Sequence, residues 1–179
     1  MVKHQISSTD EALQLLKDIK LQEIEVVKKI IENNDELVIE DVYLLAGIAK
    51  KLSGLCGELN QKALHAYFVG IKIPLFICQS QIGYFRYFYK CDYSPLGGRT
   101  TILEESFYTI SSCKKHGTFL TSRYDSIALV GCEIDQGPIT QILDIQESVS
   151  GELSVLIQNQ IDIQRGELIF NYGKEVEKY

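Results

Sequence analysis

Two residues that can do chemistry stand three positions apart, in the segment Cys113-Lys114-Lys115-His116. Lysines lower the pKa of a neighbouring thiol, and the thiolate is the form that reacts as a nucleophile. A cysteine nucleophile also needs a base within hydrogen-bonding distance and a third group that orients this base. A turn is expected at Lys115 to Gly117, and it either brings Cys113 and His116 together or points them apart. The sequence therefore leaves open a reactive thiol and an inert cysteine in a turn.

Cys113 and His116 also allow a second interpretation, as ligands of a zinc ion. Cys113 and His116 would need Cys91 and Cys132 as further ligands. Structural zinc sites usually carry two closely spaced ligand pairs, and only one such pair is present. The five cysteines contain no C-x-x-C pair, which is typical of reduced thiols in a cytoplasmic protein. We predict no metal site and no cofactor.

The segment from Gly83 to Tyr93, GYFRYFYKCDY, combines aromatic and basic residues. Side chains alternate between the two faces of a strand, so one face is wholly aromatic and the other alternates rings with cations. The alternating face, extended by an arginine in the glycine turn that follows, is the candidate binding surface. Its residues are Tyr84, Arg86, Phe88, Lys90 and Arg99.

Several classes of ligand would fit this surface. The alternative is that the segment is a central strand that packs in the core and binds no ligand. Tyrosine and arginine are enriched at the energetic centres of protein interfaces, so we expect another protein as the partner. A small molecule in a pocket lined by the aromatic rings is a second choice. Rings and cations also bind single-stranded nucleic acid. The pI of about 5.1 opposes that binding, and the RNA-recognition sequence pattern is absent, so nucleic acid is not expected.

Two further segments, Ser94 to Gly98 and Asp162 to Gly173, carry glycine turns. The second, DIQRGELIFNYG, resembles the closing motif of SET-domain lysine methyltransferases, and the first is similar to the glycine turn that begins many of these domains. The resemblance implies S-adenosylmethionine as cofactor and Tyr172 as a catalytic residue. This sequence lacks the motif with which the family binds its cofactor, because no histidine follows His116.

Charge is unevenly distributed along the chain. Residues 1–71 carry 8 basic and 11 acidic side chains, residues 72–123 carry 7 and 3, and residues 124–179 carry 3 and 10. The net charges of these segments are therefore −3, +4 and −7, which sum to −6. A basic middle segment between acidic ones indicates either a face for an acidic partner or segments that complement each other within one fold.

The first part of the chain is predicted to be helical. Ser8 and Glu11 have the spacing of a capping box, in which each side chain binds the backbone N–H of the other residue. Asn33, Asn34 and Asp35 form a stop signal, because short polar side chains bind their own backbone. Apolar residues at helical spacing indicate helices at 9–33 (one helix, or two with a break near 20–21), 39–52 and 58–69.

From Pro74 onwards, β-branched and aromatic residues alternate with turn signals, which is typical of strands. Short turns join antiparallel strands, because parallel strands need a long crossover. The expected strands are 75–79, 82–91, 106–112, 117–122, 126–133, 139–146, 152–159 and 167–172.

This order of elements predicts an α+β fold in which N-terminal helices pack on a mainly antiparallel sheet or a partly closed meander. We predict a single domain over 1–179, with a helical part at 1–72 and a β-rich part at 73–179. No apolar run approaches the ~20 residues of a membrane span, and Met1 to Ser8 lack the apolar core of a signal peptide. A soluble, cytoplasmic location without membrane contact is therefore expected.

No complete catalytic motif is visible, so the main functional hypothesis is a non-enzymatic protein. It would bind another protein as an adaptor, an inhibitor or another regulatory factor. The alternatives are a SET-like methyltransferase that uses S-adenosylmethionine, a thiol-dependent enzyme and a sensor of small ligands.

Overall fold

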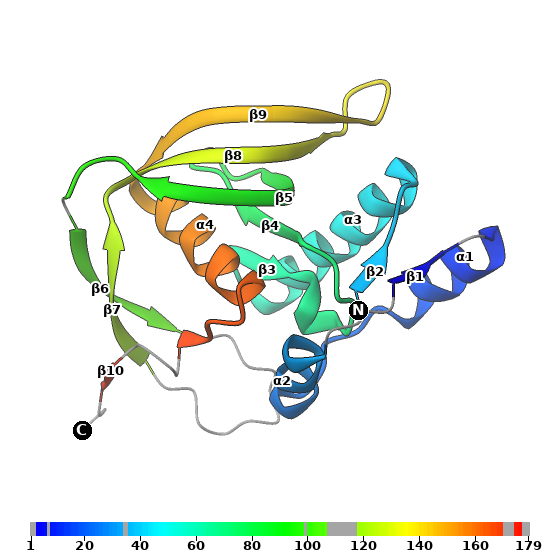
Figure 1. Ribbon diagram of the computed structural model, residues 1–179, viewed down its shortest axis with the longest axis horizontal. Helices are drawn as coiled ribbons and strands as arrows, with labels where there is room; N and C mark the ends of the chain where they lie inside the picture. The colour runs from blue at the N-terminus through cyan, green and yellow to red at the C-terminus, as the bar shows by residue number, and fades with distance from the viewer. Residues whose placement is uncertain are drawn as a thin grey trace.

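The structure is a computed structural model of the 179-residue chain, and it describes residues 3–6, 8–33, 36–98, 100–106, 118–169 and 174–176. Helices and an antiparallel sheet combine in it, so the predicted α+β class is confirmed. Figure 1 shows the layer of β5, β8 and β9 lying over helix α4, with α1, α2 and α3 toward the other end of the molecule.

The predicted helix at 9–33 is two helices, α1 (Thr9–Asp18) and α2 (Ile24–Glu32), which was one of the two alternatives. The capping box at the start of α1 is confirmed, because the Ser8 hydroxyl accepts from the Glu11 N–H and the Glu11 carboxylate accepts from the Ser8 N–H. Two short parallel strands, β1 (Lys3–Gln5) and β2 (Glu36–Val38), flank this pair of helices.

Helix α3 (Val42–Leu59) is the longest helix in the described part of the chain. The Asp41 carboxylate caps its first turn by accepting from the backbone N–H groups of Tyr43 and Leu44. Asn60 ends the helix in the left-handed conformation, with φ 52°, which asparagine adopts more readily than most residues. The structure therefore extends the helix predicted at 39–52 by two further turns.

A five-stranded sheet follows, in the order β3-β4-β5-β8-β9, and all of its pairs are antiparallel. Its strands are β3 (Ala63–His65), β4 (Leu75–Gln79), β5 (Phe85–Pro95), β8 (Ser126–Asp135) and β9 (Gln141–Ser150). A bulge in β5 places Lys90 at φ 51°. Opposite this bulge, a Cβ on Gly131 would lie 2.6 Å from Cys91 Sγ, so the close approach of β8 to β5 requires glycine there.

A second sheet has three strands in the order β10-β7-β6. These are β6 (Thr100–Ser106), β7 (Thr118–Tyr124) and β10 (Lys174–Val176), and each pair is antiparallel. Residue 125 links the two sheets. Strand β7 ends at Tyr124 in the second sheet, and β8 begins at Ser126 in the first.

Two predicted elements are wrong. The expected strand at 152–159 is part of helix α4 (Gly151–Gln164). The expected helix at 58–69 is instead the end of α3, strand β3 and a short 3-10 helix, η1 (Ala66–Val69). In both segments, burial against neighbouring elements overrides the local pattern. The predicted strand at 106–112 falls largely outside the described residues. Of the one predicted at 167–172, residues 167–169 are described and do not form a strand.

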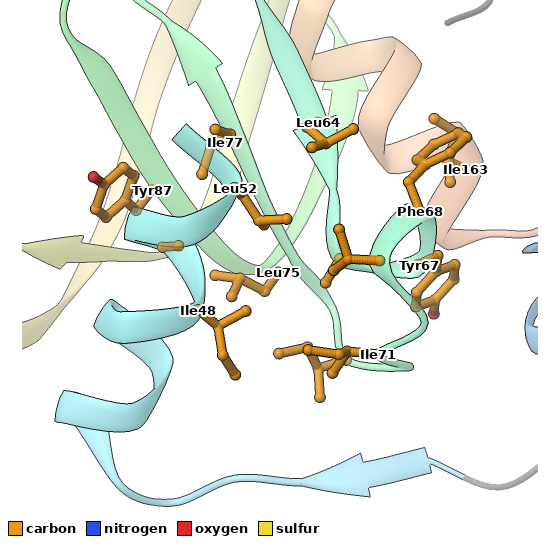
Figure 2. Packing of buried hydrophobic residues seen from close by; sticks show 14 of the residues in the cluster. Ile48, Leu52, Leu64, Tyr67, Phe68, Ile71, Leu75, Ile77, Tyr87 and Ile163 are labelled. Atoms are coloured by element: carbon orange, nitrogen blue, oxygen red, sulfur yellow. The ribbon is translucent and has the colours of Figure 1, made fainter. Parts of the chain in front are cut away.

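The apolar side chains gather in two clusters. The larger cluster joins α3, η1 and β4, and Figure 2 shows Ile48 and Leu52 of α3 beside Leu75 of β4. The smaller cluster lies between β5, β8 and α4 and includes Phe88, Leu129 and Ile161. Within the described residues, no helix is long and apolar enough to span a membrane.

Candidate functional site

Helix α4 buries polar and apolar side chains in the same few turns. Its buried apolar residues are Ile157, Ile161 and Ile163, and its buried polar residues are Ser154, Gln158, Gln160 and Asp162. Burial of a polar group costs free energy unless a partner replaces the lost water. The hydrogen bonds of α4 therefore show which of these groups hold the fold together and which have an unused donor or acceptor.

Gln158 and Ser154 attach α4 to the end of β7. The Gln158 side chain accepts from the Tyr124 N–H at 2.9 Å and donates to the Tyr124 carbonyl at 2.9 Å. The Ser154 hydroxyl donates to the same carbonyl at 3.3 Å. The side-chain amide of Gln158 thus takes the place of a neighbouring strand, and all its polar atoms are paired.

Asp162 lies at the centre of a buried charged group that we name the Asp162 cluster: Tyr93, Arg123, Asp162 and Arg165. Arg123 forms an ion pair with Asp162, and these side chains are 3% and 7% exposed. The Tyr93 hydroxyl donates to the other carboxylate oxygen at 3.2 Å. Burial, together with the charge of Asp162, raises the pKa of Tyr93 to about 12, so Tyr93 stays a neutral hydrogen-bond donor.

Arg165 covers the outer side of this cluster. Its guanidinium lies 4.7 Å from the centre of the Tyr93 ring and forms an ion pair with Asp92 in β5. The cluster therefore ties α4 to both sheets, through Tyr93 in β5 and Arg123 in β7. Because both oxygens of Asp162 accept from protein donors, this carboxylate has a positioning role.

Two other glutamine side chains of α4 have an acceptor without a partner. Gln160 donates to the Asn159 side chain at 2.9 Å, and Gln164 donates to the Cys91 carbonyl at 3.2 Å. Within the described residues, the buried side-chain oxygen of each accepts no hydrogen bond, and the Thr121 hydroxyl of β7 also has no partner there. Gln160 and Gln164 are four residues apart, so they lie on the same side of α4. This side is the candidate functional site.

The structure separates the residues of the predicted binding surface. Tyr84 is exposed at the turn before β5, whereas Phe88 is fully buried in the smaller apolar cluster. Lys90 is exposed at the bulge, and its Nζ lies 5.0 Å from the centre of the Tyr89 ring. Arg99 falls outside the described residues. The assignment of all five residues to a binding surface stays a prediction.

Arg86 is the fifth of these residues, and it is held in a cross-strand ionic network. It contacts Glu133 in β8 at 2.6 and 2.8 Å and Glu147 in β9 at 2.6 Å. The hydrogen bonds that Arg86 donates to Glu133 and Glu147 raise the pKa of Arg86 despite the opposing effect of burial. Arg86 therefore joins the three strands β5, β8 and β9.

The cysteines and histidines are placed as follows. Cys56, Cys78 and Cys91 are buried, and burial raises the pKa of both Cys56 and Cys91 to about 12. His65 is buried in β3, where its Nδ1 accepts from the Tyr67 N–H at 3.2 Å. The Cys113–His116 pair and Tyr172 lie outside the described residues.

The polar side of α4 was not predicted from the sequence, because most of this segment was expected to be a strand. One signal was present: Ser154, Gln158 and Asp162 recur every four residues, which is a helical spacing of polar residues.

The fold is similar to that of solved peptide deformylases. A probable peptide deformylase from Synechococcus phage S-SSM7 matches with a TM-score of 0.69 and 14% identity, over 86% of this chain and 99% of the phage chain. The peptide deformylase from Thermotoga maritima matches with a TM-score of 0.67 and 15% identity, over 86% and 96%. A peptide deformylase from Synechococcus elongatus, solved with actinonin, matches with a TM-score of 0.66 and 14% identity, over 97% and 84%.

No family model matches the sequence. No curated protein matches it either.

These neighbours correct the functional predictions. The main hypothesis, a non-enzymatic adaptor, inhibitor or regulatory protein with another protein as partner, is wrong, because the structural neighbours are consistently enzymes. Neither a SET-like methyltransferase nor a small-ligand sensor is supported. The resemblance to SET domains rested on about a dozen residues, of which 162–164 lie in helix α4.

Helix α4 lacks the residue types of a metal site. The helical zinc motif of hydrolases has histidines at positions i and i+4 and a glutamate after the first. Helix α4 contains no histidine and no cysteine, and Asp162, one of its two carboxylates, is paired with Arg123. Across the described ranges, no group of three His, Cys, Asp or Glu side chains could hold a metal ion. The described residues do not fit a metal.

Proposed function

We propose that this protein is an enzyme that acts on peptides, with the Gln160 side of α4 at its substrate site. The observation that carries the proposal is the fold that the chain shares with peptide deformylases over 86% of its length. The shared part includes nearly the whole of the phage and Thermotoga chains, at 99% and 96%.

The chemistry of the site supports a peptide as the substrate. Gln160 and Gln164 present buried side-chain oxygens that lack a donor in the described part of the chain. A buried acceptor without a partner costs about 1–3 kcal/mol, so its retention favours a role in binding. Peptides supply N–H donors along the backbone and at the amino terminus, and both would pair with these oxygens.

A formylated peptide is the first substrate to test. Hydrolysis would break the bond between the formyl carbon and the amino nitrogen, with water giving its hydroxyl to the carbon and a proton to the nitrogen. We expect formate and a free amino terminus when the protein is incubated with formyl-Met-Ala-Ser, measured by mass spectrometry and a formate assay.

Two controls make the test specific. The acetylated peptide distinguishes formyl removal from a general amidase activity. The Gln160→Met variant distinguishes activity of this chain from a contaminating deformylase, because a contaminant would act equally in both preparations. If the wild-type and variant proteins release no formate above a protein-free control, formyl removal is excluded. A cytoplasmic location and a single domain over 1–179 stay predictions.

A further inference from the structure

We propose that Gln160 binds the peptide directly, accepting a peptide N–H on its side-chain oxygen, in a site on α4 that works without a metal ion. This inference rests on the proposed function for the class of ligand. It goes further by naming the residue that recognises the peptide and by excluding the metal that the fold suggests.

The position of Gln160 is the first support. Its side chain is 5% exposed, and its nitrogen already donates to Asn159 at 2.9 Å. This bond fixes the orientation of the side-chain amide, so the oxygen is the polar atom that can still accept a hydrogen bond. In the described residues nothing donates to this oxygen, although it has no access to solvent. A buried acceptor with a fixed orientation is preorganised for a donor that arrives with a ligand.

The neighbouring glutamine shows what a structural side chain looks like in the same helix. Gln158, two residues earlier, uses both ends of its amide on the backbone of Tyr124. Gln158 and Gln160 are the same residue type, and both are buried. Among the described residues, the Gln158 oxygen accepts a hydrogen bond and the Gln160 oxygen accepts none. This contrast assigns binding to one and support of the fold to the other.

The donor chemistry of α4 argues against a metal at the same place. A glutamine oxygen is neutral and is a weak ligand for the divalent ions that activate water in hydrolases. Cys91, whose carbonyl receives the Gln164 amide, has a buried thiol at 1% exposure that donates to the Cys132 carbonyl at 3.4 Å. A thiol that donates a proton is not the thiolate that binds a metal.

The test is the affinity for the peptide Met-Ala-Ser amide, measured by isothermal titration calorimetry. This probe lacks a formyl group, so removal of formate cannot disturb the measurement. We expect Gln160→Met to weaken binding about three- to tenfold, the value of one hydrogen bond between neutral groups. Gln160→Glu retains an acceptor and should retain binding. Gln146→Met, in an exposed part of β9, is the matched control and should bind as the wild-type protein does.

Two further readouts separate binding from a structural role and from metal chemistry. The melting temperature of Gln160→Met should stay within about 4 °C of the wild-type value, because the lost oxygen has no partner among the described residues and the lost nitrogen gives up only its bond to Asn159. Affinity should not change when both solutions contain EDTA. Metal analysis of the purified wild-type protein should find less than about 0.1 ion per chain, far below the full occupancy of a resident site.

Each contrary result overturns a defined part of the account. Equal affinity of Gln160→Met and the wild-type protein, loss of affinity in EDTA, or one metal ion per chain would overturn the inference. Formyl removal with binding that ignores Gln160 would leave the proposed function standing without it. Binding that depends on Gln160 with no turnover of any peptide would overturn the proposed enzyme and retain the binding residue. If the wild-type protein does not bind the probe, the inference fails.

Discussion

Helices α3 and α4 are both buried, but they are buried in different ways. The buried residues of α3 are all apolar: Leu44, Leu45, Ile48, Ala49, Leu52 and Cys56. Helix α4 buries four polar side chains beside its isoleucines. It also contacts strands of both sheets, whereas the α3 contacts fall on α1, η1 and strands of the five-stranded sheet.

This difference indicates that α3 serves mainly the stability of the fold, whereas α4 also has polar groups for function. Helix α3 gains free energy from the transfer of apolar surface out of water, which needs no specific partner. Helix α4 depends on hydrogen bonds and ion pairs, and each polar group there is either satisfied by the fold or left for a ligand. Buried polar groups that the fold leaves unsatisfied are the places where stability is sacrificed for function.

The largest expected effect concerns His65, in β3, a strand that contacts both helices. Burial lowers the pKa of His65 from 6.5 to about 3. The unfolded chain therefore binds a proton at His65 more tightly than the folded protein does. The contribution of neutral His65 to the unfolding free energy is complete above pH 6.5 and is lost as the pH falls toward 3. The loss amounts to up to about 5 kcal/mol of unfolding free energy.

Urea denaturation between pH 7 and pH 4 measures this effect. His65→Asn is the control, because its side-chain oxygen can still accept from the Tyr67 N–H but does not titrate in this range. The slope of stability against pH should be shallower in the variant. Parallel curves for both proteins would show that His65 is not buried in its neutral form.

The next effect comes from the Asp162 cluster. Asp162→Asn leaves the Arg123 guanidinium buried without its carboxylate, and such a change costs about 3–5 kcal/mol. Urea denaturation at pH 7 provides the measurement. Replacing both partners, with Arg123→Met and Asp162→Leu, should cost less than Asp162→Asn alone.

The exposed pair Glu25–Lys28 of α2 is the matched control for this prediction. Glu25→Gln should change the unfolding free energy by less than about 1 kcal/mol, as is usual for exposed ion pairs. Similar losses for Asp162→Asn and Glu25→Gln would contradict the view that α4 depends on buried charge.

Leu52 tests the apolar side of the comparison. It is fully buried in α3, so Leu52→Ala should cost about 2–5 kcal/mol through lost transfer free energy and the cavity left behind. This loss should be nearly independent of pH, because no titratable group is involved. Ile82→Ala, at a side chain that is 83% exposed, should stay within about 0.5 kcal/mol in the same denaturation experiment.

The smallest of these effects separates the two glutamines of α4. Gln158→Met leaves the N–H and the carbonyl of Tyr124 without their partner, and we expect a loss of about 2 kcal/mol. Gln160→Met should cost less, because among the described residues it loses only the bond that the Gln160 nitrogen donates to Asn159. The thermal unfolding of the two variants, compared side by side, checks this order, and a larger loss at Gln160 would reverse the assigned roles.

Much of the fold could be predicted from the sequence. The Ser8 capping box, the antiparallel pairing and strand β4, which has the predicted bounds 75–79, follow from local patterns that burial reinforces. Helix α4 could not be predicted, because a helix surrounded by protein needs no single apolar stripe. Its last residues, Ile161-Asp162-Ile163-Gln164, alternate like a strand.

The candidate site was beyond the sequence for a related reason. Gln158 and Gln160 are identical in type and nearly adjacent, and only the position of Tyr124 after folding makes one of them structural. The aromatic and basic segment drew the prediction toward β5, where Phe88 packs in the core and Arg86 pairs with Glu133 and Glu147.

A crystal structure of the protein with Met-Ala-Ser amide bound tests the central claim most directly. We predict a peptide or amino-terminal nitrogen within hydrogen-bonding distance of the Gln160 side-chain oxygen, and no metal ion between the peptide and α4. A peptide bound away from α4, or one that reaches α4 through a metal ion, would contradict the account.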